Sequence, residues 1–265
     1  MISYVVVGAS RGIGLELVRQ LAADENNIIY AVVRNIASST HLSTLVASIP
    51  RSSGRVHVVE GDVVDHRAMR AAANRVAALS AGSGVDVLIH NAARMDSKDL
   101  YRGFHDYESD DALDADFMES FKVNVLGVIH TVNAFLPLLR AGTARKIIVV
   151  STGGGERDIV WRTRLGDMGA YGVSKAGTNM VATKYAVQLE QEGFTVVATS
   201  PGLVDVSATA TRELDEFSAT KLAKIVDGIK NALPDYKALM PQESVQSLLN
   251  VVAEVGPADT GTFKR

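Results

Sequence analysis

Residues 2–21 read ISYVVVGASRGIGLELVRQL, and this stretch predicts the fold of the chain. Ile2 to Val7 is a short apolar run rich in β-branched residues, as expected of a strand buried on both faces of a parallel sheet. Three glycines follow at once. The next residues repeat apolar side chains with helical spacing, at Leu15, Leu17, Val18 and Leu21. A strand, a glycine-rich turn and a helix in this order are typical of an open α/β sheet.

The glycine turn has the composition needed to bind a pyrophosphate. Glycines permit a tight turn and let the backbone approach the ligand, and the following helix offers free N–H groups and the positive end of its dipole. The spacing is G-x-x-x-G-x-G, and a simple tight turn is the alternative interpretation. We predict a dinucleotide cofactor that contacts Gly8, Ser10, Arg11, Gly12, Ile13 and Gly14.

A second apolar run, Ile28 to Val33, carries information about which dinucleotide is bound. In an NAD-binding unit an acidic residue near its end would hold the ribose 2′-hydroxyl, and this chain has Arg34 there, 20 residues after Gly14. Arg11 adds a second guanidinium group, and such groups can bind a phosphate bidentately. Either arginine could also be an ordinary surface charge. Together with the missing acid, they favour NADP(H) over NAD(H).

The composition limits the class of protein. The chain has 265 residues, 47% of them hydrophobic and 22% charged, which suits a soluble globular domain with a substantial core. A net charge of -3 gives no indication of a nucleic-acid partner. The absence of cysteine excludes disulfides, thiol catalysis and thiolate metal sites. The histidines have no metal-ligand spacing, so we predict no metal and a structural role for His90 and His130.

Two further features bear on location. The N-terminus runs directly into a strand and shows no basic region followed by a cleavable apolar segment. The longest apolar region, residues 123–139, contains Asn124, His130, Thr131 and Asn133, so it is interpreted as a buried helix rather than a membrane span. A cytoplasmic protein with no membrane association is therefore expected.

The rest of the chain continues the alternation of strands and helices. Further apolar runs lie at 55–60, 85–90, 146–150 and 195–199, with a last short strand at about 260–263. This order predicts a Rossmann-type, doubly wound parallel sheet of about seven strands with helices on both faces. Without a linker, repeat or composition shift, residues 1–265 are predicted to form a single NAD(P)-binding domain.

Small and polar residues follow several of the predicted strands, at the edge where open α/β sheets bind ligands. We assign cofactor contacts to Asp62, Val63, Asn91, Ala92, Ala93, Pro201, Gly202 and Val204. Three loops should line the substrate pocket, at about 94–116, 153–169 and 203–218. The first of them is either a substrate entrance or a solvated acidic insertion. Helices are predicted over 117–139, which contains Asn124, and over 169–192, 217–232 and 241–255.

The predicted chemistry centres on the stretch AYGVSKAG, residues 170–177. Tyr171 and Lys175 are four residues apart, so on a helix both side chains lie on one face. A free tyrosine has a pKa of about 10, and a neighbouring ammonium would lower it. The phenol could then give a proton to a substrate oxygen or take one from it. An incidental pair on an exposed helix is the alternative.

In this order the motifs resemble those of the short-chain dehydrogenase/reductase family, and in particular its fungal members and the sniffer-like carbonyl reductases. The resemblance covers essentially the whole chain and implies roles for individual residues. Tyr171 would be the general acid/base, and Lys175 would lower its pKa and hold the nicotinamide ribose. Ser151 or Thr152 would bind the substrate oxygen, and Asn124 would anchor a water in a proton relay.

The chain departs from the family pattern at several positions. Members usually have two serines where this chain has Ser151 and Thr152, and the interval from Thr152 to Tyr171 is longer than in many members, so which hydroxyl acts stays open. Ala93 replaces a glycine and should crowd the cofactor slightly. Val206 stands where the family has a threonine, with Ser207 one position late.

The sequence therefore predicts an NADPH-dependent oxidoreductase that transfers hydride between the nicotinamide and a ketone or aldehyde, or a secondary alcohol in reverse. The rival hypothesis is a non-catalytic NADP(H)-binding sensor or scaffold, to which the departures lend some support. A reaction at C=C bonds or an epimerisation is a third possibility, since a fold does not determine its reaction. The expected partner is a small carbonyl or alcohol, and family members are often homodimers or homotetramers.

Overall fold

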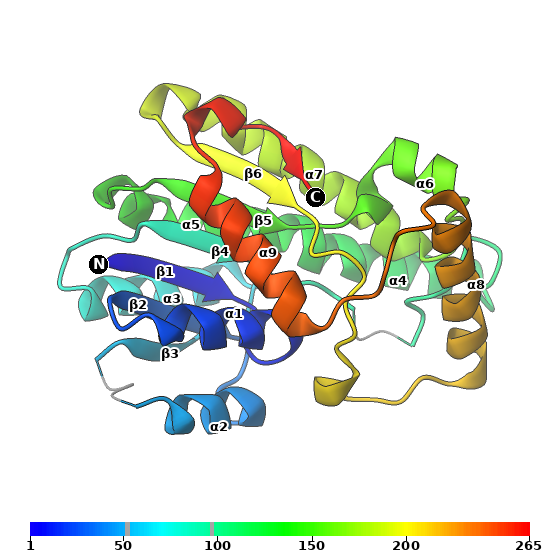
Figure 1. Ribbon diagram of the computed structural model, residues 1–265, viewed down its shortest axis with the longest axis horizontal. Coiled ribbons are helices and arrows are strands. Elements are labelled where there is room, and N and C mark those ends of the chain that lie inside the picture. Colours follow the sequence, from blue (N-terminus) through cyan, green and yellow to red (C-terminus); the bar gives the residue numbers. More distant parts are fainter. Residues whose placement is uncertain (51–53, 96–97) are drawn as a thin grey trace.

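The computed structural model describes residues 1–50, 54–95 and 98–265. Within them the chain forms a seven-stranded parallel sheet in the order β3-β2-β1-β4-β5-β6-β7. The strands are β1 Ile2–Val7, β2 Asn27–Val33, β3 Val56–Glu60, β4 Val87–His90, β5 Lys146–Val150, β6 Thr195–Thr199 and β7 Phe263–Lys264. The predicted Rossmann-type doubly wound sheet is confirmed (Figure 1).

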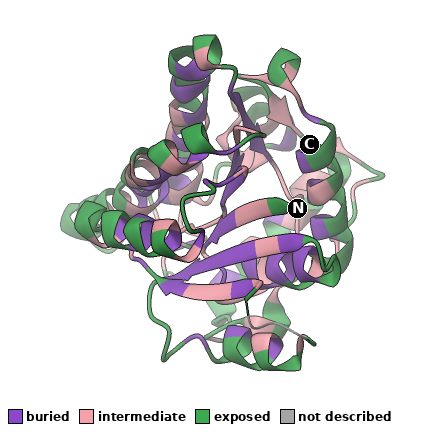
Figure 2. Cartoon of the chain, turned by 90° about the vertical axis from the view of Figure 1, so that its left-hand side faces the viewer, coloured by how far each residue is buried: buried purple, intermediate pink, exposed green. Residues whose placement is uncertain are grey.

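Helices cover both faces of this sheet. One face packs against α3 His66–Leu79, α5 Gly127–Ala141 and α7 Gly169–Leu189. The other packs against α1 Gly12–Ala23, α2 Thr40–Ser48 and α9 Pro241–Glu254. In Figure 2 the strands are buried between these layers, while the helices expose their outer faces.

The alternation of side chains along each strand produces the two cores. Successive residues of a strand point to opposite faces, so Val5 and Val7 pack with the α5 and α7 side, and Val6 packs with the α1 side. Both sets are apolar because both faces are covered, as in other all-parallel sheets. The strand order reverses between β1 and β4, so their carboxyl ends flank the crevice where such sheets bind ligands.

The helix predicted over 117–139 is longer than expected. α4 begins at Asp110 and ends at Phe121, a π-helical turn spans Lys122–Leu126, and α5 continues to Ala141. Residues 110–116 are therefore helical, and their assignment to a loop was wrong. Ser109 begins the helix, because its hydroxyl accepts a hydrogen bond from the Ala112 N–H at 3.2 Å, and acidic residues follow in the first turn.

By length and composition alone, the segment Asp110–Ala141 could cross a membrane. Part of its apolar content packs inside the protein, although only 39% of its most apolar window is buried. Val128, Val132, Phe135 and Leu139 are buried in the core cluster that also contains strand residues of β1, β4 and β5.

The other two predicted loops also contain regular structure. Residues 153–169 include a 3-10 turn, η2, at Gly153–Gly155 and a helix, α6, at Arg157–Thr163. Residues 203–218 include a 3-10 turn, η4, at Ser207–Thr209, and the helix α8 begins at Glu216 and ends at Ala232. Both α6 and α8 lie beyond the carboxyl ends of the strands (Figure 1). The helices predicted over 169–192, 217–232 and 241–255 agree with α7, α8 and α9 within a few residues.

Candidate active site

The glycine turn after β1 is held by close backbone contacts. Gly8 has a φ of +86°, and a Cβ on it would lie 2.7 Å from the Cα of Ala92. A Cβ on Gly14 would lie 2.0 Å from the carbonyl oxygen of Gly8. The side-chain amide of Asn91 donates to that same carbonyl at 3.0 Å. The predicted cofactor residues of β1 and β4 therefore form one tightly packed unit in which glycine is required.

A distant segment crosses the N-terminus of α1. The N–H of Gly12, the first residue of the helix, donates to Oγ1 of Thr209 at 3.0 Å. A Cβ on Gly12 would lie 3.4 Å from Val206, and Gly12 has a φ of +55°. The predicted 203–218 loop thus contacts the predicted pyrophosphate site. Thr209 was missed because its distance in sequence from the glycine turn gives no signal of this contact.

The two arginines proposed to select the cofactor lie near this turn. Arg34 is exposed and directly follows β2, and Arg11 directly precedes α1. Ser10 and Ile13 are half-buried beside them. The selection of NADP(H) stays a prediction.

Asp62 and Val63 lie at the carboxyl end of β3. Oδ1 of Asp62 accepts from the N–H of Val64 at 3.1 Å, and the carbonyl of Val63 contacts Nδ1 of His130 at 2.8 Å. Asp65, rather than Asp62, caps α3 by accepting from the N–H of Arg67 at 2.8 Å.

Pro201, Gly202 and Val204 follow β6. The carbonyl of Pro201 accepts from the Ser244 hydroxyl at 2.6 Å, and Val204 forms a bridge with Leu239. These contacts place the start of the 203–218 segment beside α9.

Tyr171 and Lys175 lie in the first turns of α7, as predicted. Lys175 is 2% exposed, and its Nζ donates to the carbonyl of Val150 at 2.9 Å, 5.9 Å from the centre of the Tyr171 ring. Burial raises the pKa of Tyr171 and lowers the pKa of Lys175 to about 8. The expected lowering of the Tyr171 pKa by Lys175 is not seen in this structure, because desolvation of the phenol raises that pKa. The phenol is therefore protonated at neutral pH.

The two hydroxyls at the end of β5 have different surroundings. Ser151 is 2% exposed, and its Oγ has no hydrogen-bond partner among the described residues. Thr152 is half-buried, and its Oγ1 accepts from the N–H of Gly154 at 3.1 Å. That bond leaves the Thr152 hydroxyl hydrogen available to a ligand.

The three glycines of η2 explain how β5 approaches α7. A Cβ on Gly155 would lie 2.7 Å from the backbone of Lys175, and a Cβ on Gly172 would lie 3.1 Å from the carbonyl oxygen of Gly154. Only residues without side chains fit between the turn and the helix at this distance. The turn therefore brings Thr152 next to the helical turn that carries Tyr171.

Asn124 lies in the π-helical turn and is 1% exposed. Its Oδ1 accepts from the N–H of Arg94 at 2.8 Å, and its Nδ2 donates to Oγ of Ser174 at 2.9 Å. Its backbone carbonyl accepts from Oγ1 of Thr178 at 2.6 Å. Oγ of Ser174 donates in turn to the carbonyl of Tyr171 at 2.8 Å. Asn124 thus ties the exit of β4 to the turn that holds Tyr171; π turns of this kind are frequent at functional sites.

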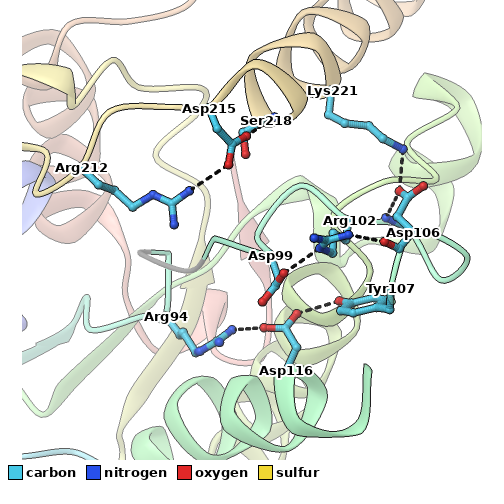
Figure 3. A network of polar contacts seen from close by, with 11 residues as sticks. Arg94, Asp99, Arg102, Asp106, Tyr107, Asp116, Arg212, Asp215, Ser218 and Lys221 are labelled. Carbon is cyan, nitrogen blue, oxygen red and sulfur yellow. Dashed lines mark hydrogen bonds and ion pairs between the residues drawn. The ribbon is translucent and has the colours of Figure 1, made fainter. Parts of the chain in front are cut away.

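The predicted 94–116 segment is fastened by charged side chains, as Figure 3 shows. Asp116 pairs with Arg94 and accepts from the Tyr107 hydroxyl at 2.7 Å. Arg102 and Asp99 form an ion pair at 2.6 Å. Asp99 and Asp116 are therefore paired and largely buried, whereas Glu108, Asp110, Asp111 and Asp114 are exposed, so only part of this segment is a solvated acidic stretch. Asp96 and Ser97, which also fall in this predicted loop, lie outside the described residues.

Lys221 of α8 joins this segment to the loop before α7. Its Nζ lies 2.6 Å from Asp106 and 2.8 Å from Asp167, and all three side chains are at most 25% exposed. We call Lys221, Asp106 and Asp167 the clamp. It connects two of the segments predicted to line the pocket, 94–116 and 153–169, to α8, which begins at the end of the third. Lysine and aspartate residues this far apart in sequence carry no signal of such pairing.

In residues 1–50, 54–95 and 98–265, no group of three or more histidine, aspartate or glutamate side chains is arranged to hold a metal ion.

Residues 3–216 match the family model of the short chain dehydrogenases. The short-chain dehydrogenase/reductase AacuF of Aspergillus aculeatus is 35% identical over 254 residues, covering 95% of this chain and 92% of that protein. Among solved structures, the NADPH-bound carbonyl reductase from chicken fatty liver is 26% identical, with a TM-score of 0.76, over 98% of this chain and 90% of that one. The carbonyl reductase Sniffer of D. melanogaster shares the fold at 20% identity, with a TM-score of 0.75, over 99% and 96%.

Proposed function

The chain belongs to the short-chain dehydrogenase family, and on that premise we propose that it is an NADPH-dependent carbonyl reductase. It reduces a ketone or aldehyde, or oxidises a secondary alcohol in the reverse direction. The observation that carries the proposal is that α7 brings Tyr171 and the buried Lys175 to the end of β5, where the glycine turn that follows Thr152 packs against this helix. A phenol whose pKa is raised by burial is protonated at neutral pH, as a proton donor to a carbonyl oxygen must be.

The chain's own residues would bind and orient the reactants. The glycine turn, in which a Cβ on Gly8 or Gly14 has no room, fits a pyrophosphate approached by backbone. When bound, NADPH would supply the hydride. Tyr171 would donate the proton to the substrate oxygen, and Thr152 would orient that oxygen by its free hydroxyl hydrogen. Ser151 is buried, so Thr152 is the better candidate for this contact.

Support for NADPH comes from Arg34 and Arg11 at the predicted ribose, together with the missing acid. A guanidinium group favours a 2′-phosphate, whereas an acidic residue would repel it. The chicken carbonyl reductase, at 26% identity, binds NADPH.

The first test is a fluorescence titration of the purified protein with NADPH and NADH, with Arg34→Asp alongside. Tight NADPH binding that Arg34→Asp weakens at least tenfold is expected, since one charge-assisted contact is lost and a repulsion is added. Equal affinity for NADH would contradict the 2′-phosphate argument. Failure to bind either dinucleotide would overturn the proposal.

The second test addresses catalysis. Tyr171→Phe should lower kcat by about 10²–10⁴-fold, the usual contribution of a positioned acid. The Kd for NADPH should change by no more than about fivefold, the worth of about one hydrogen bond, since the variant removes one hydroxyl. Carbonyl-dependent NADPH oxidation across a substrate panel is the assay. Binding without any turnover in the wild type would favour the sensor or scaffold instead.

We also propose that the protein forms a homodimer or homotetramer through α4 and α7. Met118 is 70% exposed, Met180 57% and Val187 68%, and a Cβ on Gly177 of α7 would lie 3.7 Å from Phe121, so the two helices adjoin. Light scattering on the wild type and on Met180→Glu tests this: a lower mass for the variant is expected.

A further inference from the structure

Two buried polar side chains at the carboxyl ends of β4 and β5 have no use in the mechanism proposed above. His90 is 1% exposed, and the Ala92 backbone is the one group in the described part of the chain that approaches its ring as a hydrogen-bond partner, so at least one ring nitrogen has none. Oγ of Ser151, which is 2% exposed, has no partner among the described residues either. Buried polar groups in native proteins nearly always have a partner, so a pair of unpartnered ones requires an explanation.

Both side chains lie on the same face of the sheet. His90 pairs in register with Val149, and Val149 belongs to the core cluster under α5 and α7. Side chains alternate along a strand, so Ser151, two residues after Val149, points to this face as well. The β5–β6 ladder continues through Ser151, whose N–H donates to Thr199 at 2.7 Å, so the alternation holds at that residue.

Lys175 reaches the same place from α7. Its Nζ bonds the carbonyl of Val150, the residue between Val149 and Ser151. An ammonium group has three donors, so two remain after this bond. Burial, with the charge of Lys175, lowers the pKa of His90 to about 3, although the Ala92 backbone acts in the opposite direction. The imidazole is therefore neutral near pH 7, with one ring nitrogen free to accept.

Among the described residues, the titratable groups that the printed contacts bring to this place come from α7 and β4. Lys175 and Tyr171 face it from α7, with the ammonium 5.9 Å from the centre of the Tyr171 ring. From β4 it is faced by His90. Asn124, which the family resemblance would assign to a water-anchoring role, has protein partners for its amide oxygen, its amide nitrogen and its carbonyl.

We propose that His90 is a positioning residue for Lys175. Its neutral ring and the Ser151 hydroxyl bind one water molecule, which accepts a hydrogen bond from the Lys175 ammonium and donates one to the imidazole. Buried waters with about three such partners are a normal part of protein structure. The ammonium is thereby stabilised at a second point besides the Val150 carbonyl, and it stays charged beside Tyr171. This proposal rests on the proposed function for its kinetic consequence only.

The test compares His90→Leu and His90→Asn with Leu88→Ala as a matched control. Leu88 is buried on the same strand and in the same core cluster, but it offers no hydrogen-bond acceptor. The pKa of Lys175 is measured by NMR on the protein carrying [13Cε]lysine, with Lys175→Met for assignment. The pH profile of kcat is recorded in parallel.

His90→Leu should lower the pKa of Lys175 by about half a unit or more and move the alkaline limit of kcat to lower pH by the same amount, because an acceptor for the charged form is lost. His90→Asn, whose amide oxygen can accept, should restore most of both values. Leu88→Ala should change neither. Ser151→Ala should lower the pKa of Lys175 by a smaller amount. If His90→Leu does not fold, Ser151→Ala becomes the test of the proposal.

An unchanged pKa of Lys175 in His90→Leu would overturn the proposal, and so would an equal change in Leu88→Ala. If His90→Leu does not fold, an unchanged value in Ser151→Ala would overturn it. The NMR readout needs no turnover. A shift in the pKa of Lys175 in a protein that reduces no carbonyl would therefore support this inference while contradicting the proposed function.

Discussion

The glycine turn and the region around the clamp of Lys221, Asp106 and Asp167, which we call the mouth of the predicted pocket, are held together in opposite ways. Around Gly8 and Gly14 the chain is fastened by backbone contacts that leave no room for a side chain. Around Lys221 it is fastened by ion pairs between partly buried side chains from three segments. A backbone cradle can bind a cofactor common to many proteins, whereas a mouth built of side chains can change with its substrate. The difference suggests that cofactor binding tolerates few substitutions and that the mouth tolerates many.

Among the variants that test this difference between the two regions, Gly14→Ala should have the largest effect on stability. A Cβ 2.0 Å from the Gly8 carbonyl forces the turn apart, so the free energy of unfolding should fall by about 3 kcal/mol or more. Urea denaturation and NADPH titration measure the two effects. Gly166→Ala is the control, because nothing lies within 4 Å of its added Cβ. Equal stability of both variants would show that the turn is not tightly packed.

The next largest effect is expected for Lys175, which lies between the two regions, and it concerns how the free energy of unfolding depends on pH. Its pKa is about 8 in the folded protein and 10.5 without burial. From pH 8 to 10 the unfolded chain binds more protons than the folded one, so the free energy of unfolding should rise with pH by about 2–3 kcal/mol. The raised pKa of Tyr171 opposes this only above pH 10. Lys175→Met should lack the rise in urea melts at each pH, and an identical slope would contradict the burial argument.

Removal of the clamp should have a smaller effect, confined to the mouth. Lys221→Met should cost about 1 kcal/mol of stability and raise KM for the carbonyl severalfold, with the Kd for NADPH unchanged, since its ion pairs are partly buried. Lys224→Met is a matched control, because Lys224 is 74% exposed and 3.5 Å from the same Asp167. A changed NADPH affinity in Lys221→Met would mean that the two regions are coupled.

The smallest effect, on NADPH affinity, is expected at Thr209, where the 203–218 segment contacts the glycine turn. Thr209→Val removes the acceptor for the Gly12 N–H while keeping the shape of the side chain. That N–H would then be free for a cofactor phosphate, so NADPH should bind up to about fivefold more tightly, the worth of about one hydrogen bond. Ser207→Ala in the same turn should leave the Kd unchanged, and weaker binding to Thr209→Val would contradict the idea of competition.

The periodicity of apolar residues made the fold predictable from the sequence. The properties of single side chains were harder to predict from their neighbours in the sequence. The apolar runs and the glycine turn led to the observed sheet because each pattern acts over a few neighbouring residues. The loop assigned to 110–116 was wrong because a serine cap and acidic first turn lack an apolar stripe. The direction expected for the pKa of Tyr171 differs from that in the structure, because sequence spacing shows the neighbouring ammonium and conceals the desolvation of the phenol.

By itself the sequence determined the alternation of strands and helices, the places where glycine is needed and the pairing of Tyr171 with Lys175 on one helical face. These depend on backbone geometry and on short-range spacing. Only the tertiary structure decided that the amide of Asn124 bonds Arg94 and Ser174, that the buried Ser151 hydroxyl has no partner among the described residues, and that Lys221 pairs with Asp106 and Asp167. Those facts depend on desolvation and on contacts between residues far apart in the chain, which no local pattern records.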